Sequence, residues 1–385
     1  MKSTIVSAVL ASLLLVQQSV AHPGQSAAEA QAEIRERAEY MSKAAPHKRS
    51  LAHCAAKLKA RNLDAARRAA KVEALREKRA ITQNKPFLRA RDFEDVLNTD
   101  HHSNLTVTPE SDPSELFTGN ASCILTPETT EGPYWVQGEL IRQDIVDGEA
   151  GVPMTLDVQV VDVNTCEPVP QVFTEIWHCN STGVYGGVVA NGNGNTDDEA
   201  NLDNTMLRGV QLTDKDGVVS FDTLFPGHYT GRATHIHVMT HVGAQQLPNN
   251  TVAGGNITHV GQIFFDQDLI TLAEQQEPYL TNTQTLTTNA DDFIMAEEAE
   301  NVDPVVDYVL LGDDISQGIF AWIAFGMDAT ANQSVTPAVY YTENGGVKNP
   351  NGVSGPPGGA APSGFMPSGA MPSGTAIPSA ALESS

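Results

Sequence analysis

Residues 154–160 read Met-Thr-Leu-Asp-Val-Gln-Val, and this stretch decides the fold class. Its apolar side chains alternate with polar ones, so an extended strand here has one apolar and one polar face. Similar short apolar segments, separated by Gly- and Pro-rich turns, occur at 169–177, 210–212, 218–224 and 319–325. Short strands with regular turns predict an all-β, two-sheet sandwich rather than alternating strands and helices.

Three features of this region support more specific expectations. Residues 210–212 and 218–224 flank Asp216-Gly217, a dipeptide typical of a β-hairpin turn. The segment 319–325 is apolar on both faces, which indicates a central strand. Residues 190–206 form a long polar excursion, with two open interpretations: a lid over a site or a surface insertion.

The first residues predict the compartment. Lys2 precedes a short apolar run, and small residues at Ser19 and Ala21 mark a cleavage point, a pattern typical of a secretory signal peptide. No other apolar run approaches the length that a membrane-spanning helix needs. The protein is therefore expected to be secreted and extracellular.

Composition divides the chain into five segments. They are a signal peptide (1–21), a helical basic arm or pro-segment (22–92), a polar linker (93–117), the β-sandwich domain (118–345), and a Gly/Pro/Ser-rich tail expected to be disordered or O-glycosylated (346–385).

The net charge of the N-terminal part of the chain, which includes the basic arm, is opposite in sign to that of the remainder, here called the body. Residues 1–92 carry 18 of the 23 basic residues and 8 of the 47 acidic ones, a net charge of +10, whereas the remainder carries −34. A body this acidic repels phosphate backbones, which argues against a nucleic-acid partner. The arm, which contains the dibasic pairs Lys48-Arg49 and Lys78-Arg79, has three open interpretations: a cleaved pro-segment, a homodimerisation arm, or a solvated helix without a further role.

Glycosylation sequons agree with export. Six Asn-x-Ser/Thr sites follow the signal peptide, at Asn104, Asn120, Asn180, Asn249, Asn256 and Asn332.

Two histidines on one predicted strand are the sharpest candidate site. The segment 225–237 reads Phe-Pro-Gly-His-Tyr-Thr-Gly-Arg-Ala-Thr-His-Ile-His. Because side chains alternate along a strand, His235 and His237 point to one face while Ile236 points to the core. Two imidazoles side by side on a rigid strand form a pair of metal ligands.

Two tyrosines extend this pattern. Tyr229 follows a Pro-Gly turn, and Tyr185 lies in Gly183-Val184-Tyr185 after a strand ending in Trp177-His178. With the neighbouring strings at 175–180 and 232–237, the chain resembles the intradiol ring-cleavage dioxygenases, including the catechol and protocatechuate enzymes. It is most similar to their secreted fungal branch, over residues 123–330.

The resemblance implies a mononuclear non-haem Fe(III) held by Tyr185, Tyr229, His235 and His237. Phenolate oxygen is a hard anionic donor that suits ferric iron, and a bound cation favours the deprotonated tyrosine. The family further implies catechols and O2 as substrates and cleavage between the two hydroxyl-bearing carbons to a muconate-type diacid. Tyr229 would be the ligand that catechol displaces and would then accept a catechol proton, whereas Tyr185 would be retained.

Three more residues gain a role from the resemblance. Arg232, one of four basic residues between 118 and 345, would stabilise negative charge developing on the substrate. Without the family, a salt bridge to one of the many carboxylates is the simpler interpretation. Gln262 matches a glutamine that supports the metal ligands, and Tyr134 matches a segment lining the substrate pocket. Taken alone, a Gly-Pro turn before two aromatic residues is typical of a core.

Four cysteines allow three fully paired arrangements, and export favours disulfides. Cys54 lies in the arm, whereas Cys123, Cys166 and Cys179 lie in the β domain. Cys179 stands where the intracellular family members carry a small residue, so the resemblance suggests a bridge from Cys179 to Cys123 or Cys166.

The other histidines of the β domain are assigned outside the metal site. We interpret His178 and His228 as structural, and His241 lies too far along its strand to share an ion with His237. His259 is expected at the surface beside a sequon.

Three functions are compatible with these features. The leading hypothesis is a secreted Fe(III) intradiol dioxygenase acting on catechol-type aromatics. The alternative is a non-catalytic secreted β-sandwich that binds phenolics or polysaccharide. A structural surface glycoprotein would account for the tail and sequons but not for the Tyr–Tyr–His–His spacing.

Overall fold

The computed structural model describes residues 35, 51–54, 57, 63–81, 123–124, 132–190, 192–194, 197–299 and 302–352. The signal peptide, the linker, the sequons at Asn104 and Asn120 and the tail beyond residue 352 lie outside these ranges.

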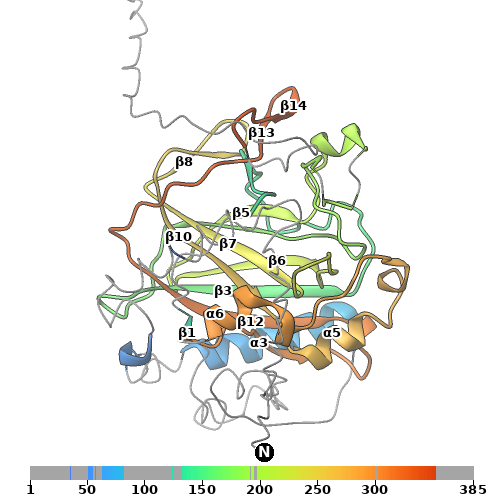
Figure 1. Ribbon diagram of the computed structural model, residues 1–385. Coiled ribbons are helices and arrows are strands. Elements are labelled where there is room, and N and C mark those ends of the chain that lie inside the picture. Colours follow the sequence, from blue (N-terminus) through green and yellow to red (C-terminus); the bar gives the residue numbers. More distant parts are fainter. Residues whose placement is uncertain are drawn as a thin grey trace, which may run out of the picture. The chain divides into compact units, whose positions relative to one another are not determined.

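One layer of the fold is a five-stranded sheet built around the alternating segment. β3 (Pro153–Asp162) pairs in parallel with β12 (Ile319–Met327) and antiparallel with β6 (Val218–Leu224). β11 (Asp307–Leu310) and β1 (Cys123–Ile124) pair with β12. β12 is therefore an interior strand, buried along its whole length, which confirms the central strand expected at 319–325 (Figure 1).

The second layer is a four-stranded sheet in the order β10-β7-β4-β5. Its strands are β4 (Phe173–Trp177), β5 (Arg208–Leu212), β7 (His235–Val242) and β10 (Asn256–Phe264).

The hairpin predicted around Asp216-Gly217 is wrong. The turn itself is present, with the Gly217 amide donating to the Asp214 carbonyl oxygen at 3.0 Å. However, β5 pairs with β4 in one sheet and β6 pairs with β3 in the other. The turn therefore connects a strand of one sheet to a strand of the other.

The main core lies between the two layers. It combines alternate side chains of β3, such as Leu156 and Val158, with Ile176 of β4 and Ile236 and Val238 of β7. Each layer thus presents one apolar face to the other, so the all-β fold class predicted from the alternation is confirmed.

The remaining elements surround these layers. They are β2 (Val136–Gln137), β8 (Gln245–Gln246), β9 (Val252–Ala253), β13 (Val339–Thr342), β14 (Gly345–Lys348), α3 (Leu63–Arg79), α5 (Gln267–Ala273), α6 (Phe293–Ala299), η2 (Ala52–Cys54), η3 (Glu199–Asp203), η4 (Tyr279–Thr281), η5 (Asn289–Asp291) and η6 (Ile315–Gln317). Among the described residues, no helix is both long and apolar enough to cross a membrane.

The helix α3 of the basic arm packs on its own chain. Val72 and Leu75 are buried in a cluster with four residues of the adjoining sheet region, namely Val309, Leu311, Phe320 and Trp322. Arg67 pairs with Asp214 at 2.7 Å, and Lys71 donates to the Ser220 hydroxyl at 2.8 Å. The basic helix thus docks on the acidic domain, where its apolar residues Val72 and Leu75 are covered.

A disulfide also joins the arm to the domain. Cys54 is bonded to Cys166 across 112 residues of sequence. Cys179 is instead a buried free thiol whose Sγ donates to the Gly227 carbonyl oxygen at 3.3 Å. The bridge suggested for Cys179 is therefore wrong, because the closest partner of Cys166 comes from the arm.

Candidate functional site

The predicted histidine pair lies on the face of β7 that points away from the main core. His235 and His237 are buried to 2% and 1% exposure, while Ile236 between them joins the core between the sheets. The period-two alternation predicted from the sequence is confirmed. β10 places Gln262 directly opposite His237 in the strand register.

Two loops bring the tyrosines to this face. Tyr185 and Tyr229 are both buried and belong to one aromatic cluster. The loops can approach because they carry glycines: a Cβ on Gly183 would collide with the His228 carbonyl oxygen, and one on Gly227 with that of Asn180. Gly183 also has a φ of +79°, which disfavours other residues there.

The four predicted metal ligands converge. The Nε2 atoms of His235 and His237 are 3.1 Å apart, and the Tyr229 hydroxyl lies 3.3 Å from His235 Nε2. The ring centroids of Tyr185 and Tyr229 are 5.6 Å apart, and those of Tyr185 and His237 are 6.0 Å apart. Residues 185, 229, 235 and 237 therefore surround one buried point.

Hydrogen bonding prepares His235 to act as a nitrogen donor. Its Nδ1 lies 2.6 Å from the Ala233 carbonyl oxygen, which can only accept, so Nδ1 carries the proton and Nε2 has a free lone pair. Burial, followed by the positive charge of Arg232, lowers the pKa of His235 well below its usual value. A neutral imidazole with Nε2 facing the site is the form that binds metals.

The tyrosines need a cation to ionise. Burial raises the pKa of Tyr185 and of Tyr229, and for Tyr185 the neighbouring Tyr229 raises it further. Two phenols in this position stay protonated unless a strong positive charge compensates the lost hydration. Two phenol oxygens and two imidazole nitrogens therefore fit a hard, highly charged ion such as Fe(III).

Arg232 and Gln262 form a buried polar pair beside these ligands. Arg232 Nη2 donates to Gln262 Oε1 at 2.5 Å, and Arg232 Nε donates to Asp292 Oδ2 at 2.8 Å. Within the described chain, Arg232 Nη1 and Gln262 Nε2 are buried without a hydrogen-bond partner. These two donors suit an anionic or oxygen-rich ligand in the site. Arg232 therefore makes the salt bridge considered for it, to Asp292, and its site role stays a prediction.

Tyr134 packs directly on this group. Its ring lies 4.7 Å from that of Tyr185 and 6.0 Å from that of Tyr229. Burial raises the pKa of Tyr134, so its hydroxyl stays protonated, and no described residue hydrogen-bonds to it. The structure therefore places Tyr134 with an orphaned donor beside the predicted ligands.

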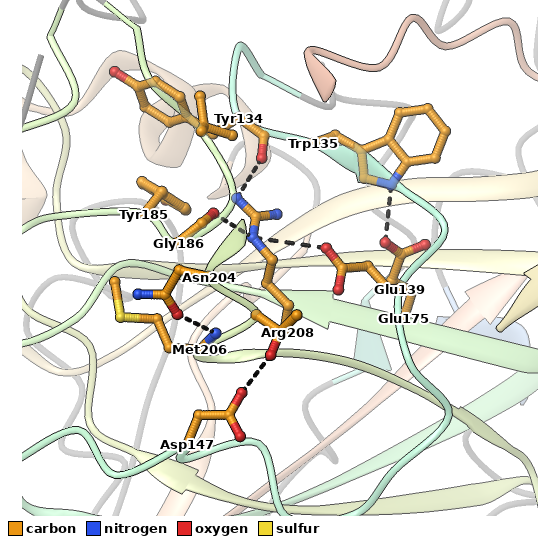
Figure 2. A network of polar contacts seen from close by, with 12 residues as sticks. Tyr134, Trp135, Glu139, Asp147, Glu175, Tyr185, Gly186, Asn204, Met206 and Arg208 are labelled. Carbon is orange, nitrogen blue, oxygen red and sulfur yellow. Dashed lines mark hydrogen bonds and ion pairs between the residues drawn. The ribbon is translucent and has the colours of Figure 1, made fainter. Parts of the chain in front are cut away.

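The buried side chain of Arg208 holds the backbone of Tyr134 and of the turn after Tyr185 through hydrogen bonds (Figure 2). Arg208 Nη2 donates to the Tyr134 carbonyl oxygen and Arg208 Nε donates to that of Gly186, each at 2.7 Å. Its guanidinium lies 5.9 Å from the Tyr185 ring centroid. Figure 2 also shows the contact with the Glu139 carboxyl, whose Oε1 lies 3.7 Å from Arg208 Nε.

Two glutamates complete this network. Burial raises the pKa of Glu139 to about 8, against the opposing effect of Arg208. Glu175 accepts from Trp135 Nε1 at 2.9 Å (Figure 2). Its other oxygen, Oε2, contacts His241 Nε2 at 2.8 Å. His241 is thus held away from His237, as expected from its distance along the strand.

The other histidines divide into two confirmed assignments and one error. His178 contacts Thr223 Oγ1 and His228 contacts Glu274 Oε1, so both have structural partners. His259 is not at the surface: it is 2% exposed and stacks on Phe325 at 4.6 Å. A β-bulge between Ile257 and His259 breaks the alternation of β10 there.

The described sequons differ in accessibility. Asn249, Asn256 and Asn332 are exposed. Asn180 is partly buried, and its Nδ2, the atom that a glycan would modify, donates to Glu149 at 3.0 Å.

Comparison with known protein families identifies the region that holds this site. Residues 127–292 match the family model described as Dioxygenase. Over these residues the chain is similar to the dioxygenase family. The match includes Tyr134, Tyr185, Tyr229, Arg232 and both histidines of the pair. It confirms the resemblance to the intradiol dioxygenases and the prediction that the protein is an enzyme of this class.

Solved structures of dioxygenases are similar to this region of the chain. An intradiol ring-cleavage dioxygenase from Tetranychus urticae is 28% identical, with a TM-score of 0.45, and the match covers 55% of this chain and 98% of that one. Catechol 1,2-dioxygenase from Acinetobacter sp. ADP1 is 22% identical, with a TM-score of 0.35 and coverage of 55% and 67%. Hydroxyquinol 1,2-dioxygenase from Pseudomonas putida DLL-E4 is 19% identical, with a TM-score of 0.33 and coverage of 56% and 69%. No curated protein sequence matches the chain.

Several residues around the site were not predicted. Asp292 lies 60 residues after Arg232, and nothing local distinguishes it from the other carboxylates of an acidic domain. Arg208 had a usable signal, because it is one of only four basic residues between 118 and 345. Glu139 and Glu175 became recognisable only through the partners that the fold gives them.

Proposed function

We propose that this protein is a secreted, mononuclear non-haem Fe(III) dioxygenase that cleaves catechol-type rings between the two hydroxyl-bearing carbons to muconate-type diacids. The observation that carries the proposal is the convergence of two phenols and two imidazoles on one buried point of a dioxygenase domain. Two oxygen and two nitrogen donors of this kind favour ferric over softer or divalent ions.

The chain's own residues have distinct tasks in this proposal. Tyr185, Tyr229, His235 and His237 would hold the ion, which when bound supplies the Lewis acidity that makes a catecholate ring reactive towards O2. Tyr229, whose hydroxyl lies 3.3 Å from His235 Nε2 within this donor set, would be the base that takes up a catechol proton.

The second set of residues orients the substrate. Arg232 Nη1 and Gln262 Nε2 are buried donors with no hydrogen-bond partner among the described residues, placed to bind negative oxygens of the bound substrate. Tyr134 would close the aromatic side of the pocket against Tyr185. Burial of the whole group excludes water and strengthens each of these interactions.

Secretion is part of the proposal. The Cys54–Cys166 disulfide supports it, because disulfides persist in oxidising compartments. The N-terminal signal pattern and the exposed sequons at Asn249, Asn256 and Asn332 agree. Intact-mass analysis of protein recovered from the medium checks the removal of residues 1–21 and the glycans.

The test is the visible absorption spectrum of the ferric-loaded protein, with and without excess catechol. We expect a broad tyrosinate-to-iron absorption that shifts when catechol is added, together with oxygen uptake and a product carrying two added oxygen atoms. Tyr229→Phe should keep the fold and lose most of the turnover. A protein that stays colourless after loading contradicts the metal assignment. Iron binding without turnover of catechol or hydroxyquinol would favour a binding module.

A further inference from the structure

The polar segment 190–206 contributes two buried amides to the domain. Asn193 and Asn201 are 1% and 4% exposed, although asparagine is mostly found at protein surfaces. A buried amide is costly unless its hydrogen bonds are made. The partners of these two side chains therefore indicate what the segment does.

Asn193 binds the peptide groups on both sides of Tyr185. Its Oδ1 accepts from the Tyr185 amide at 2.7 Å, and its Nδ2 donates to the Tyr185 carbonyl oxygen at 2.9 Å. The same Nδ2 donates to the Val188 carbonyl oxygen at 2.8 Å. One side chain thus closes the ends of the turn at residues 185–188.

Asn201 binds the same turn from the helix η3. Its Nδ2 donates to the carbonyl oxygens of Tyr185 and Val188 at 2.8 and 2.7 Å. The backbone carbonyl oxygen of Asn201 accepts from the Gly187 amide at 2.9 Å. Two independent amides therefore converge on the two ends of the turn.

The turn needs this support because its centre is glycine. Gly186 and Gly187 have little intrinsic conformational preference, and Gly187 adopts a φ of +75°. A side chain at Gly186 would meet Met206, so the close approach requires glycine as well. Without external hydrogen bonds, the backbone that carries Tyr185 would be free to rotate.

We propose that Asn193 and Asn201 are positioning residues for Tyr185, so that the segment 190–206 braces a metal ligand. This inference rests on the proposed function, in which Tyr185 is the ligand retained when catechol binds. By fixing the Tyr185 backbone at both its amide and its carbonyl, the two asparagines keep the phenol directed towards His237 and Tyr229. Neither of the two earlier interpretations, a lid or a surface insertion, accounts for these bonds.

The test compares ferric-loaded Asn193→Ala and Asn201→Ala with the wild-type protein. The control is Asn204→Ala, which lies in the same segment and loses the hydrogen bond from the Met206 amide to its Oδ1. We measure iron retention against a chelator, the position of the tyrosinate absorption and the melting temperature. We expect each of the first two variants to bind iron on the order of tenfold more weakly, with a shifted absorption, and the control to resemble wild type.

A second comparison separates positioning from simple stability. In a Tyr185→Phe background, Asn193→Ala should cause no further loss of iron affinity, because the ligand it positions is gone. Variants that melt earlier but keep wild-type iron affinity and absorption overturn the inference. If Asn193→Ala does not fold, Asn201→Ala decides, because it leaves the Tyr185 amide bonded to Asn193. A wild-type protein that binds no ferric iron overturns the proposed function and this inference together.

Discussion

The indole of Trp177 lies flat against the imidazole of His237, with ring centroids 4.7 Å apart and planes 5° apart. The strand register causes this contact, because β4 places Trp177 directly beside His237 of β7. Trp177 is fully buried, so the stack sets the plane of His237 before any ligand enters. A preorganised ring is what a metal site requires of its supporting residues.

Removing this stack should loosen the metal site. We expect Trp177→Leu to lower the iron retained after dialysis several-fold and to destabilise the fold by about 3 kcal/mol through the cavity it leaves. The control is Trp322→Leu, a buried tryptophan under α3, which should lose similar stability and keep its iron. Equal iron retention in the two variants contradicts the orienting role. Iron analysis and thermal melting check the prediction.

The carboxylate of Asp292 should fix the orientation of the Arg232 guanidinium. Its Oδ2 accepts from Arg232 Nε at 2.8 Å and from the Ala233 amide at 2.7 Å, with both charged side chains fully buried. We expect Asp292→Asn to reduce kcat on the order of a hundredfold with a smaller change in KM, because the donors facing the substrate lose their alignment.

A double variant tests whether Asp292 acts through Arg232. Asp292→Asn combined with Arg232→Lys should be no slower than the worse single variant, since both changes disrupt one unit. Asp314→Asn, which removes the capping carboxylate of η6, is the control and should keep wild-type kinetics. Additive losses in steady-state oxygen uptake would show that the two residues act separately.

The basic arm should remain attached after cleavage at Lys78-Arg79. Cys54 lies N-terminal to this pair, so the arm fragment that ends at Arg79 stays bonded to Cys166 of the domain. In a variant whose other dibasic pairs, Lys48-Arg49 and Arg67-Arg68, are replaced so that a dibasic-specific protease cuts only after Arg79, digestion should yield two bands on reducing gels and one on non-reducing gels. Release of the arm fragment without a reductant would contradict this.

Removing the disulfide should lower stability. Closing a loop of this length contributes about 4–5 kcal/mol in the chain-entropy model, so Cys54→Ser should melt clearly earlier than wild type. Unchanged melting would mean that the contacts of α3 alone hold the arm.

Stability should fall with acid through two buried histidines. Burial lowers the pKa of His259 to about 3 and that of His178 to about 4, below the usual 6.5. Each therefore contributes stability that is complete above pH 6.5 and is lost as the pH falls towards its folded-state pKa. Each adds about 1.4 kcal/mol per pH unit in that window. Urea unfolding at pH 7.5, 6 and 5 should show this slope, and His259→Phe should reduce it by about one proton; an unchanged slope refutes the assignment.

Local patterns were sufficient for much of the site. The alternation at 154–160 and the apolar run at 319–325 predicted strands that the structure contains, because strand periodicity depends only on neighbouring residues. The same periodicity placed His235 and His237 on one face. The glycines before Tyr185 and Tyr229 belonged to recognisable motifs, because only glycine fits where two backbone segments approach this closely.

Only the tertiary structure decided which distant groups meet. Asp292 reaches Arg232, Asn193 and Asn201 brace Tyr185, and Cys54 bonds Cys166 because the two sheets, the loops and α3 pack as they do. The failed hairpin and the buried His259 have the same origin, because sheet membership and a bulge are settled by long-range pairing. The sequence determined the strand pattern and the donor types through local geometry. Packing between segments far apart in the chain selected their partners, and such contacts have no local signature.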